Sequence, residues 1–323
     1  MSPTRPFLVL GVGLLAVSTG ALFVRFAQAD GVPSLAIAAV RLTLSTLILA
    51  PVALQRHRAD FAALPPRAWL LVLLSGVFLG LHFATWISSL EYTSIANSTV
   101  LVSSSPLFVA LIAWIILREP PGRMVWAGLL IAIAGSVVIA LSDVCSLEAG
   151  CAVSGLIGDG SSLAGDALAL TGAAAVAVYL VIGRRLRQSL ALVPYITLTY
   201  GAAAVSLLAA CLVTGTPFTG YDSIAYLWLL LLALLPQLIG HSSFNWALKH
   251  LPATFVSVAT LGEPILSSAL AMLVIGEAPT PLKIVGGLVV LVGIGIATQA
   301  SGVRGQVSGP SKDPASRGSV SDA

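Results

Sequence analysis

Two ionisable residues of this chain lie inside long apolar segments, where a buried charge needs a partner. Glu263 lies in the segment 253–275, directly before Pro264, and Arg41 lies in the segment 35–54. Ionisable side chains at membrane depth are costly and mark binding sites, proton relays or ion pairs. Glu263 could bind a substrate ammonium or exchange a proton, and Arg41 could bind a carboxylate through two parallel hydrogen bonds. A structural ion pair, or a bond to a neighbouring helix, is the alternative for both residues.

Position along the segment sets how deep each of these two groups would lie in a bilayer. Glu263 is about ten residues from the start of its segment, or about 14 Å at 1.5 Å per residue, near the middle of a hydrocarbon core about 30 Å thick. Arg41 lies about 9 Å from the opposite edge, and its long side chain can reach the middle. Together they would suit a zwitterion such as an amino acid, if the fold brings them to one cavity.

Polar residues recur at helical spacing in the segment 224–247. Gln237, His241 and Asn245 stand at i, i+4 and i+8, so they share one face of a helix. Three hydrogen-bonding side chains should not point at lipid. We expect them to line a polar cavity; hydrogen bonding to a neighbouring helix is the alternative.

Aromatic residues share a face in the segment 68–89, which we expect to correspond to 224–247 by internal symmetry. Phe78, His82 and Trp86 are spaced four residues apart there. They could form the apolar wall of a pocket, and ordinary core packing is the alternative. Either His82 or His241 could titrate during transport, although a histidine in this setting can also be simply hydrogen-bonded. Two tyrosines in other apolar segments, Tyr179 and Tyr200, rank below these candidates.

Several kinds of chemistry have no support in the sequence. It has no His/Cys cluster at metal-ligand spacing, so neither a metal site nor another cofactor is predicted. Phosphate-binding loops, the GxSxG motif and the HExxH motif are absent. We therefore expect a protein that is not an enzyme and does not bind nucleic acid.

The elements that hold these residues are read from composition and apolar length. Hydrophobic residues make up 57% of the 323 residues and charged residues 9%, against about 25% charged in a soluble domain, and the mean hydropathy is +0.99. Apolar segments of about 20 residues are the length of a membrane span. The sequence predicts an all-α membrane protein with ten transmembrane helices, at 7–26, 35–54, 68–89, 96–117, 124–141, 165–183, 191–213, 224–247, 253–275 and 282–300.

Two segments lie outside this pattern. Residues 142–164 form a loop rich in Ser, Gly and Asp, and residues 301–323 form a polar tail that we expect to be disordered. Cys145 and Cys151 lie in the loop and could form a disulfide if the loop faces an oxidising compartment. The first apolar segment is longer than that of a signal peptide, so we expect it to be retained as a helix.

Basic residues are distributed unevenly between the two predicted sides of the membrane. One side would hold thirteen of the 16 Lys and Arg residues, the other would hold Arg25 and Lys283, and Arg41 lies within a span. Cytoplasmic loops carry the excess of basic residues in membrane proteins. We therefore expect both termini to be cytoplasmic, in a multi-pass protein of the plasma or inner membrane.

The chain also contains an internal repeat at a constant offset. Residues 90–139 align without a gap on residues 248–297. The paired residues include Pro106/Pro264, Glu119/Glu277, Gly128/Gly286 and Gly135/Gly293, with Pro106 and Pro264 expected to break their helices. We expect one five-helix repeat at 1–141 and a second at 165–300. Because five is odd, the second copy is inverted, which is the architecture of alternating-access transporters.

These residues resemble the EamA-like branch of the drug/metabolite transporter superfamily. The resemblance covers residues 5–300 and is carried by Ala39-Val40-Arg41-Leu42, by Ser105-Pro106-Leu107 with Leu117-Arg118-Glu119, and by Gly262-Glu263-Pro264 with Gly276-Glu277. It implies a ten-helix transporter of metabolites, often an exporter of amino acids or related compounds. The long loop with two cysteines departs from a minimal member of that family.

We therefore predict a secondary transporter with a cavity between two inverted halves, lined first by Glu263, Arg41, Gln237, His241 and Asn245. Its partners would be a small-molecule substrate, the lipid bilayer and, in one mode of energy coupling, protons; its oligomeric state is open. One alternative is a membrane-embedded enzyme that uses Glu263 and His241 as acid and base on a lipid-linked substrate. Another is a membrane sensor that transports nothing.

Overall fold

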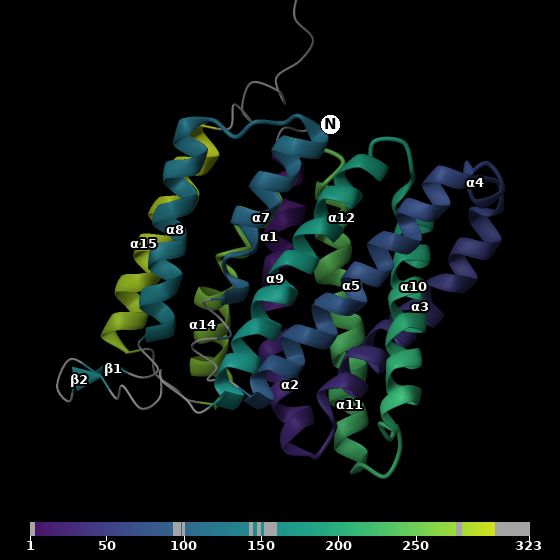
Figure 1. Ribbon diagram of the computed structural model, residues 1–323, viewed down its shortest axis with the longest axis horizontal. Helices are drawn as coiled ribbons and strands as arrows, with labels where there is room; N and C mark the ends of the chain where they lie inside the picture. The colour runs from purple at the N-terminus through teal and green to yellow at the C-terminus, as the bar shows by residue number, and fades with distance from the viewer. Residues whose placement is uncertain are drawn as a thin grey trace, which may run out of the picture.

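Figure 1 shows the computed structural model, a bundle of helices that run up and down beside one another. The structure describes residues 4–92, 98, 101–141, 145–146, 150–151, 160–275 and 280–300. These residues are helical apart from turns and one short hairpin, which confirms the predicted all-helical class. The predicted tail 301–323 lies outside the described residues.

The elements follow one another with short connections. Two of them, η1 and η3, are π-helical turns that continue a neighbouring α-helix. The helices are α1 (Arg5–Ser18), α2 (Gly20–Ala29), α3 (Ser34–Arg56), α4 (Arg58–Ala62), α5 (Pro66–Tyr92), α7 (Ser105–Ile112), η1 (Ala113–Leu117), α8 (Arg123–Leu141), α9 (Gly160–Leu186), α10 (Leu192–Thr214), α11 (Ser223–Leu232), η3 (Ala233–His241), α12 (Ser242–Ala247), α13 (Ala253–Thr260), α14 (Glu263–Ile275) and α15 (Pro281–Ala300). The hairpin pairs β1 (Cys145–Ser146) with β2 (Gly150–Cys151).

Seven helical stretches of the described chain are long and apolar enough to cross a membrane. They are Arg5–Ala29, Ser34–Arg56, Pro66–Tyr92, Leu163–Leu186, Leu192–Thr214, Ser223–Ala247 and Ala253–Val274. Three shorter apolar helices, Ser105–Leu117, Arg123–Ile139 and Ile284–Ala297, fall within the remaining predicted segments. The chain is therefore a multi-pass membrane protein by length and composition.

The surface of the bundle suits contact with lipid. Leu212 is 78% exposed, Val213 88% and Leu273 80%. Side chains of this kind cover the outside of the bundle, while the backbone polar groups are satisfied within helices, as a hydrocarbon environment requires. Large aliphatic side chains therefore face outward because the solvent on that side is apolar.

Two helices are interrupted at positions that the repeat pairs with each other. Before α7 the chain tightens, so that the Ser104 amide donates to the Leu101 carbonyl at 3.1 Å. Before α14 the Gly262 amide donates to the Ala259 carbonyl, also at 3.1 Å. Each interruption precedes a proline at the second position of the new helix, where the missing N–H is tolerated.

Glycines allow the closest helix contacts. In α5, Gly76 and Gly80 face α10: a Cβ at Gly76 would lie 2.5 Å from the Thr199 carbonyl oxygen, and one at Gly80 would lie 2.6 Å from Ser206 Oγ. The backbone approach predicted from this glycine pair is thus present. Helices α8 and α15 run side by side at the left edge of Figure 1. There a Cβ at Gly135 would lie 2.7 Å from the Gly286 oxygen.

Candidate functional site

The candidate site is built around Arg41, which α3 carries into the interior of the bundle. Its side chain is only 2% exposed. The Nε group donates a hydrogen bond of 3.0 Å to Oε1 of Gln237, and the guanidinium lies over the Phe83 ring, 4.0 Å from its centroid. Ser45, one turn further along α3, donates at 2.8 Å to the Arg41 carbonyl and at 3.2 Å to the Ala233 carbonyl. These contacts join α3 to α5 and to η3.

Gln237 owes its position to a local widening of its helix. Pro236 lies directly before it in η3 and lacks a backbone N–H, so the regular α-helical ladder cannot continue there. A π-helical turn results, a feature found frequently at functional sites. Gln237 is fully buried, and its Nε2 group has no hydrogen-bond partner within the described chain.

Asn245 lies two turns beyond Gln237 and joins three helices. Its Nδ2 group donates to the Tyr179 hydroxyl of α9 at 2.6 Å and to the Tyr200 hydroxyl of α10 at 3.3 Å. The Tyr200 hydroxyl also lies 3.1 Å from Ser242 Oγ. Asn245 Oδ1 is buried and, as far as the described residues extend, has no partner.

His241 and His82 meet through an aromatic ring that lies between them. The Phe83 ring lies 4.9 Å from the His82 ring and 5.2 Å from the His241 ring. His82 Nδ1 is 2.9 Å from the Gly172 carbonyl oxygen, and its ring stacks on Trp86 at 6.0 Å. The predicted wall of α5 thus adjoins the polar face of η3.

Glu263 is the first residue of α14 and remains partly exposed. It is close enough to Arg41 for the two charges to interact. The ion pairs of the described residues nevertheless join His57 to Asp60 and Glu119 to Arg184, so Arg41 has no carboxylate in direct contact there. A simple structural ion pair between Arg41 and Glu263 is therefore absent from this part of the chain.

The structure thus brings most of the predicted residues into one buried group. We call it the polar cluster: Arg41, Gln237, His241 and Asn245, with His82 and Trp86 joined through Phe83. Phe83 was not selected from the sequence, because one phenylalanine in an apolar segment carries no signal. Tyr179 and Tyr200 ranked too low, since only the tertiary contacts with Asn245 single them out. Within the described residues no group of three His, Cys, Asp or Glu side chains could hold a metal ion.

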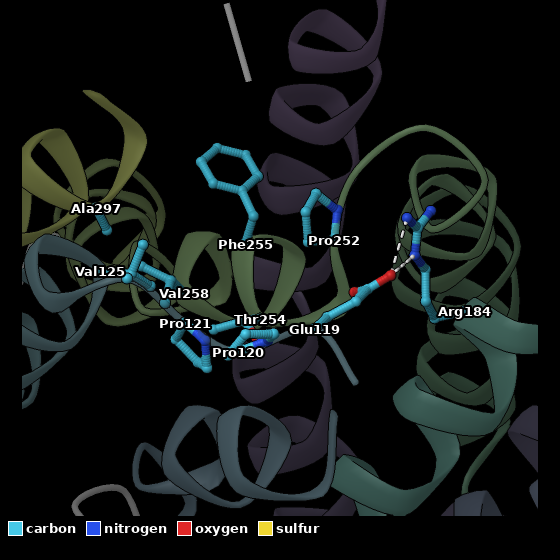
Figure 2. Close-up of a pocket in the computed structure, with 11 residues that line it drawn as sticks. Glu119, Pro120, Pro121, Val125, Arg184, Pro252, Thr254, Phe255, Val258 and Ala297 are labelled. Atoms are coloured by element: carbon cyan, nitrogen blue, oxygen red, sulfur yellow. Dashed lines mark hydrogen bonds and ion pairs between the residues drawn. The ribbon is translucent and has the colours of Figure 1, made fainter. Parts of the chain in front are cut away.

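A separate cavity of ≈ 380 Å³ lies near the N-terminal end of the bundle (Figure 2). Glu119 and Arg184 form its polar side, with Arg184 Nε and Nη2 each 3.3 Å from Glu119 Oε1. Glu119 Oε2 is buried without a partner among the residues described. Phe255 lines the apolar side and packs edge-on against Phe7, 5.9 Å away between centroids.

Comparison with known proteins decides the family. The model of the EamA-like transporter family matches residues 6–141 and again residues 163–299. The chain belongs to the EamA-like transporter family. This assignment confirms the resemblance inferred from the sequence motifs, and it makes the chain a multi-pass membrane protein of a transporter family.

Individual relatives of this EamA-like chain are distant but cover much of it. Uncharacterized transporter YdfC of Bacillus subtilis (strain 168) is 24% identical over 220 residues, which is 67% of each chain. Uncharacterized transporter YwfM of the same organism is 24% identical over 241 residues, 72% of this chain and 74% of the relative. A solved crystal structure covers 92% of this chain and 98% of its own, with a TM-score of 0.73 and 20% identity, and shows the fold alone.

Proposed function

We propose that this protein is a secondary transporter that moves an amino acid or related small metabolite by alternating access, more readily as an exporter. The observation that carries the proposal is the polar cluster, in which a buried guanidinium and two unpartnered amide groups meet within a bundle of apolar helices. Polar groups at this depth are costly unless they serve a substrate or its path. Membership of a transporter family supports the same conclusion.

The arrangement that suits this function is ten spans in two inverted five-helix repeats. Its support comes from the 158-residue offset, from the paired interruptions before Ser105 and Glu263, and from the family match, which occurs once in each half. Within the polar cluster, Arg41 belongs to the first half and Gln237 to the second. Movement of one half against the other would therefore open the cluster to either side.

The cavity of Figure 2 suits the cytoplasmic mouth of such a path. In this proposal the basic end of the bundle, including the N-terminus, is cytoplasmic and the membrane is the plasma or inner membrane. Glu119 of the first half and Arg184 of the second then hold that mouth closed through their ion pair. Glu263, which faces the path from α14, would bind a substrate ammonium or exchange a proton.

Transport by proteoliposomes tests the proposal. We expect purified protein to accumulate one class of solute from a mixed metabolite extract, read by mass spectrometry against empty liposomes. A dependence on an imposed pH gradient would assign proton coupling. Folded and correctly inserted protein that accumulates nothing would contradict the proposal and favour a membrane enzyme or a sensor.

A further inference from the structure

We propose that Arg41 and Gln237 together form a binding site for the carboxylate of the transported amino acid. This inference rests on the proposed transport function and adds which atoms recognise the substrate and which substrate charge they select. The two side chains already touch across the interface of α3 and η3, at 3.0 Å. They therefore form a ready pair that one ligand group can bridge.

The orientation of the Gln237 amide follows from its partner. A guanidinium only donates hydrogen bonds, so the group that faces Arg41 has to be the carbonyl oxygen Oε1. The amide NH₂ is bonded to the same carbon and therefore lies close to the guanidinium. That Nε2 group is 0% exposed and lacks a partner in the described chain. A buried donor without an acceptor is destabilising, which points to a ligand that accepts from it.

The charge of Arg41 is the second observation. A guanidinium carries five N–H donors, and Gln237 Oε1 accepts from one of them. Gln237 is neutral, the Phe83 ring offers only its weakly negative face, and Glu263 interacts from a distance. A buried cation in contact with neutral groups is costly, whereas a carboxylate in contact would compensate it. The site is thus incomplete until an anion binds.

The geometry favours a carboxylate with a single negative charge. Its two oxygens can accept from the remaining guanidinium N–H groups and from Gln237 Nε2 at the same time. A doubly charged phosphate would meet only one cation and would be repelled by the nearby charge of Glu263. A neutral carboxamide would present an NH₂ group to two donors. The pair Arg41–Gln237 therefore selects acids over their amides.

Binding to the full-length wild-type protein in detergent tests this selectivity directly. The probes are the standard amino acids, each measured beside its own carboxamide, with sodium chloride and inorganic phosphate as competing anions. We expect at least one acid to bind, its amide to bind at least about tenfold more weakly, the loss expected for one charge-assisted hydrogen-bond pair, and neither anion to displace the acid. Equal binding of acid and amide, displacement by phosphate, or no binding of any amino acid would overturn the proposal.

Gln237→Glu places a carboxylate of the same size against Arg41. We expect it to weaken binding of the acid by about tenfold or more, because the new side chain occupies the guanidinium. Without ligand it should melt at a higher temperature than Gln237→Leu, since it compensates the buried charge. Gln188→Glu makes the same change at an exposed position of the chain and should bind the acid as the wild type does.

Arg41→Gln provides a second variant should Gln237→Glu fold poorly. It should lower the affinity for the acid to that for the amide, and undiminished preference for the acid in either variant would overturn the proposal. Reconstitution separates this inference from the proposed function. Transport of amides as fast as acids would leave the transporter proposal standing and refute the carboxylate site. Selective binding of acids by protein that transports nothing would do the reverse.

Discussion

Gly128 of α8 and Gly293 of α15 pack against each other's backbone. A Cβ added to Gly128 would lie 2.6 Å from the Gly293 carbonyl oxygen, and one added to Gly293 would lie 2.6 Å from the Gly128 oxygen. The 158-residue offset pairs Gly128 with Gly286 and Gly135 with Gly293, so each helix contributes both members of a repeated contact. Two antiparallel helices related by the repeat would meet in this way. In lipid such close packing is a main source of helix association.

Alanine at Gly293 should therefore destabilise the protein. A new methyl group would also lie 2.5 Å from the Ala132 amide nitrogen, so α8 and α15 would have to separate. We expect Gly293→Ala to reduce stability by about 1–3 kcal/mol, as overpacking does, measured by thermal unfolding in detergent. Gly295→Ala, two residues along the same helix, is the control because its Cβ meets nothing within 4 Å. An equal effect of both changes would contradict this packing.

Loss of the Glu119–Arg184 ion pair should open the cavity of Figure 2. Thr254 lines that cavity and is 7% exposed. With the three native cysteines changed to serine, we expect Glu119→Gln to speed maleimide labelling of Thr254→Cys several-fold. Asp60→Asn, which removes the other ion-pair carboxylate, should leave labelling unchanged.

Exchange of the two charges gives a stricter test of the same ion pair. Glu119→Arg combined with Arg184→Glu should slow labelling again relative to either single change. The recovery should be incomplete, because Arg184 Nη1 also donates to the Leu248 carbonyl at 2.8 Å. Labelling that stays fast in the double variant would show that the ion pair does not close the cavity.

Glu263→Gln should uncouple transport from the pH gradient. The amide keeps the size of the side chain but cannot exchange a proton. We expect solute exchange at equal pH to persist in proteoliposomes, and acceleration by an imposed gradient to disappear. Glu91→Gln, an exposed carboxylate at the end of α5, is the matched control. Gradient-driven uptake that survives in Glu263→Gln would assign coupling to another group.

Cys145 and Cys151 should form a disulfide in protein from an oxidising compartment. The β1–β2 register places their Cα atoms opposite each other. Opposed residues of an antiparallel pair have Cα atoms about 4.5–5.5 Å apart, within the range of a disulfide of about 4.4–6.8 Å. Alkylation of denatured protein should give one adduct, at Cys211, before reduction and three after it. Three adducts without reduction would show that the bond is absent.

The polar face of the eighth predicted span illustrates how far periodicity reaches. Gln237, His241 and Asn245 were selected because a four-residue spacing places side chains on one helical face. The structure turns that face toward α3, α5, α9 and α10. Periodicity assumes a regular α-helix, however, and the π-helical turn at Pro236 alters the rotation of this face. The direct partner of Arg41 therefore proved to be Gln237, although depth alone had suggested Glu263.

The sequence by itself determined the class, the apolar segments, the repeat and the depth of the polar residues. These properties follow from local composition and spacing, because a lipid environment requires long apolar helices whose backbone is satisfied internally. Only the tertiary structure decided which buried groups touch: Arg41 with Gln237 and Phe83, and Asn245 with Tyr179 and Tyr200. Depth fixes one coordinate of a side chain, whereas contact also depends on helix rotation and packing, which glycines and proline breaks far away in the chain control.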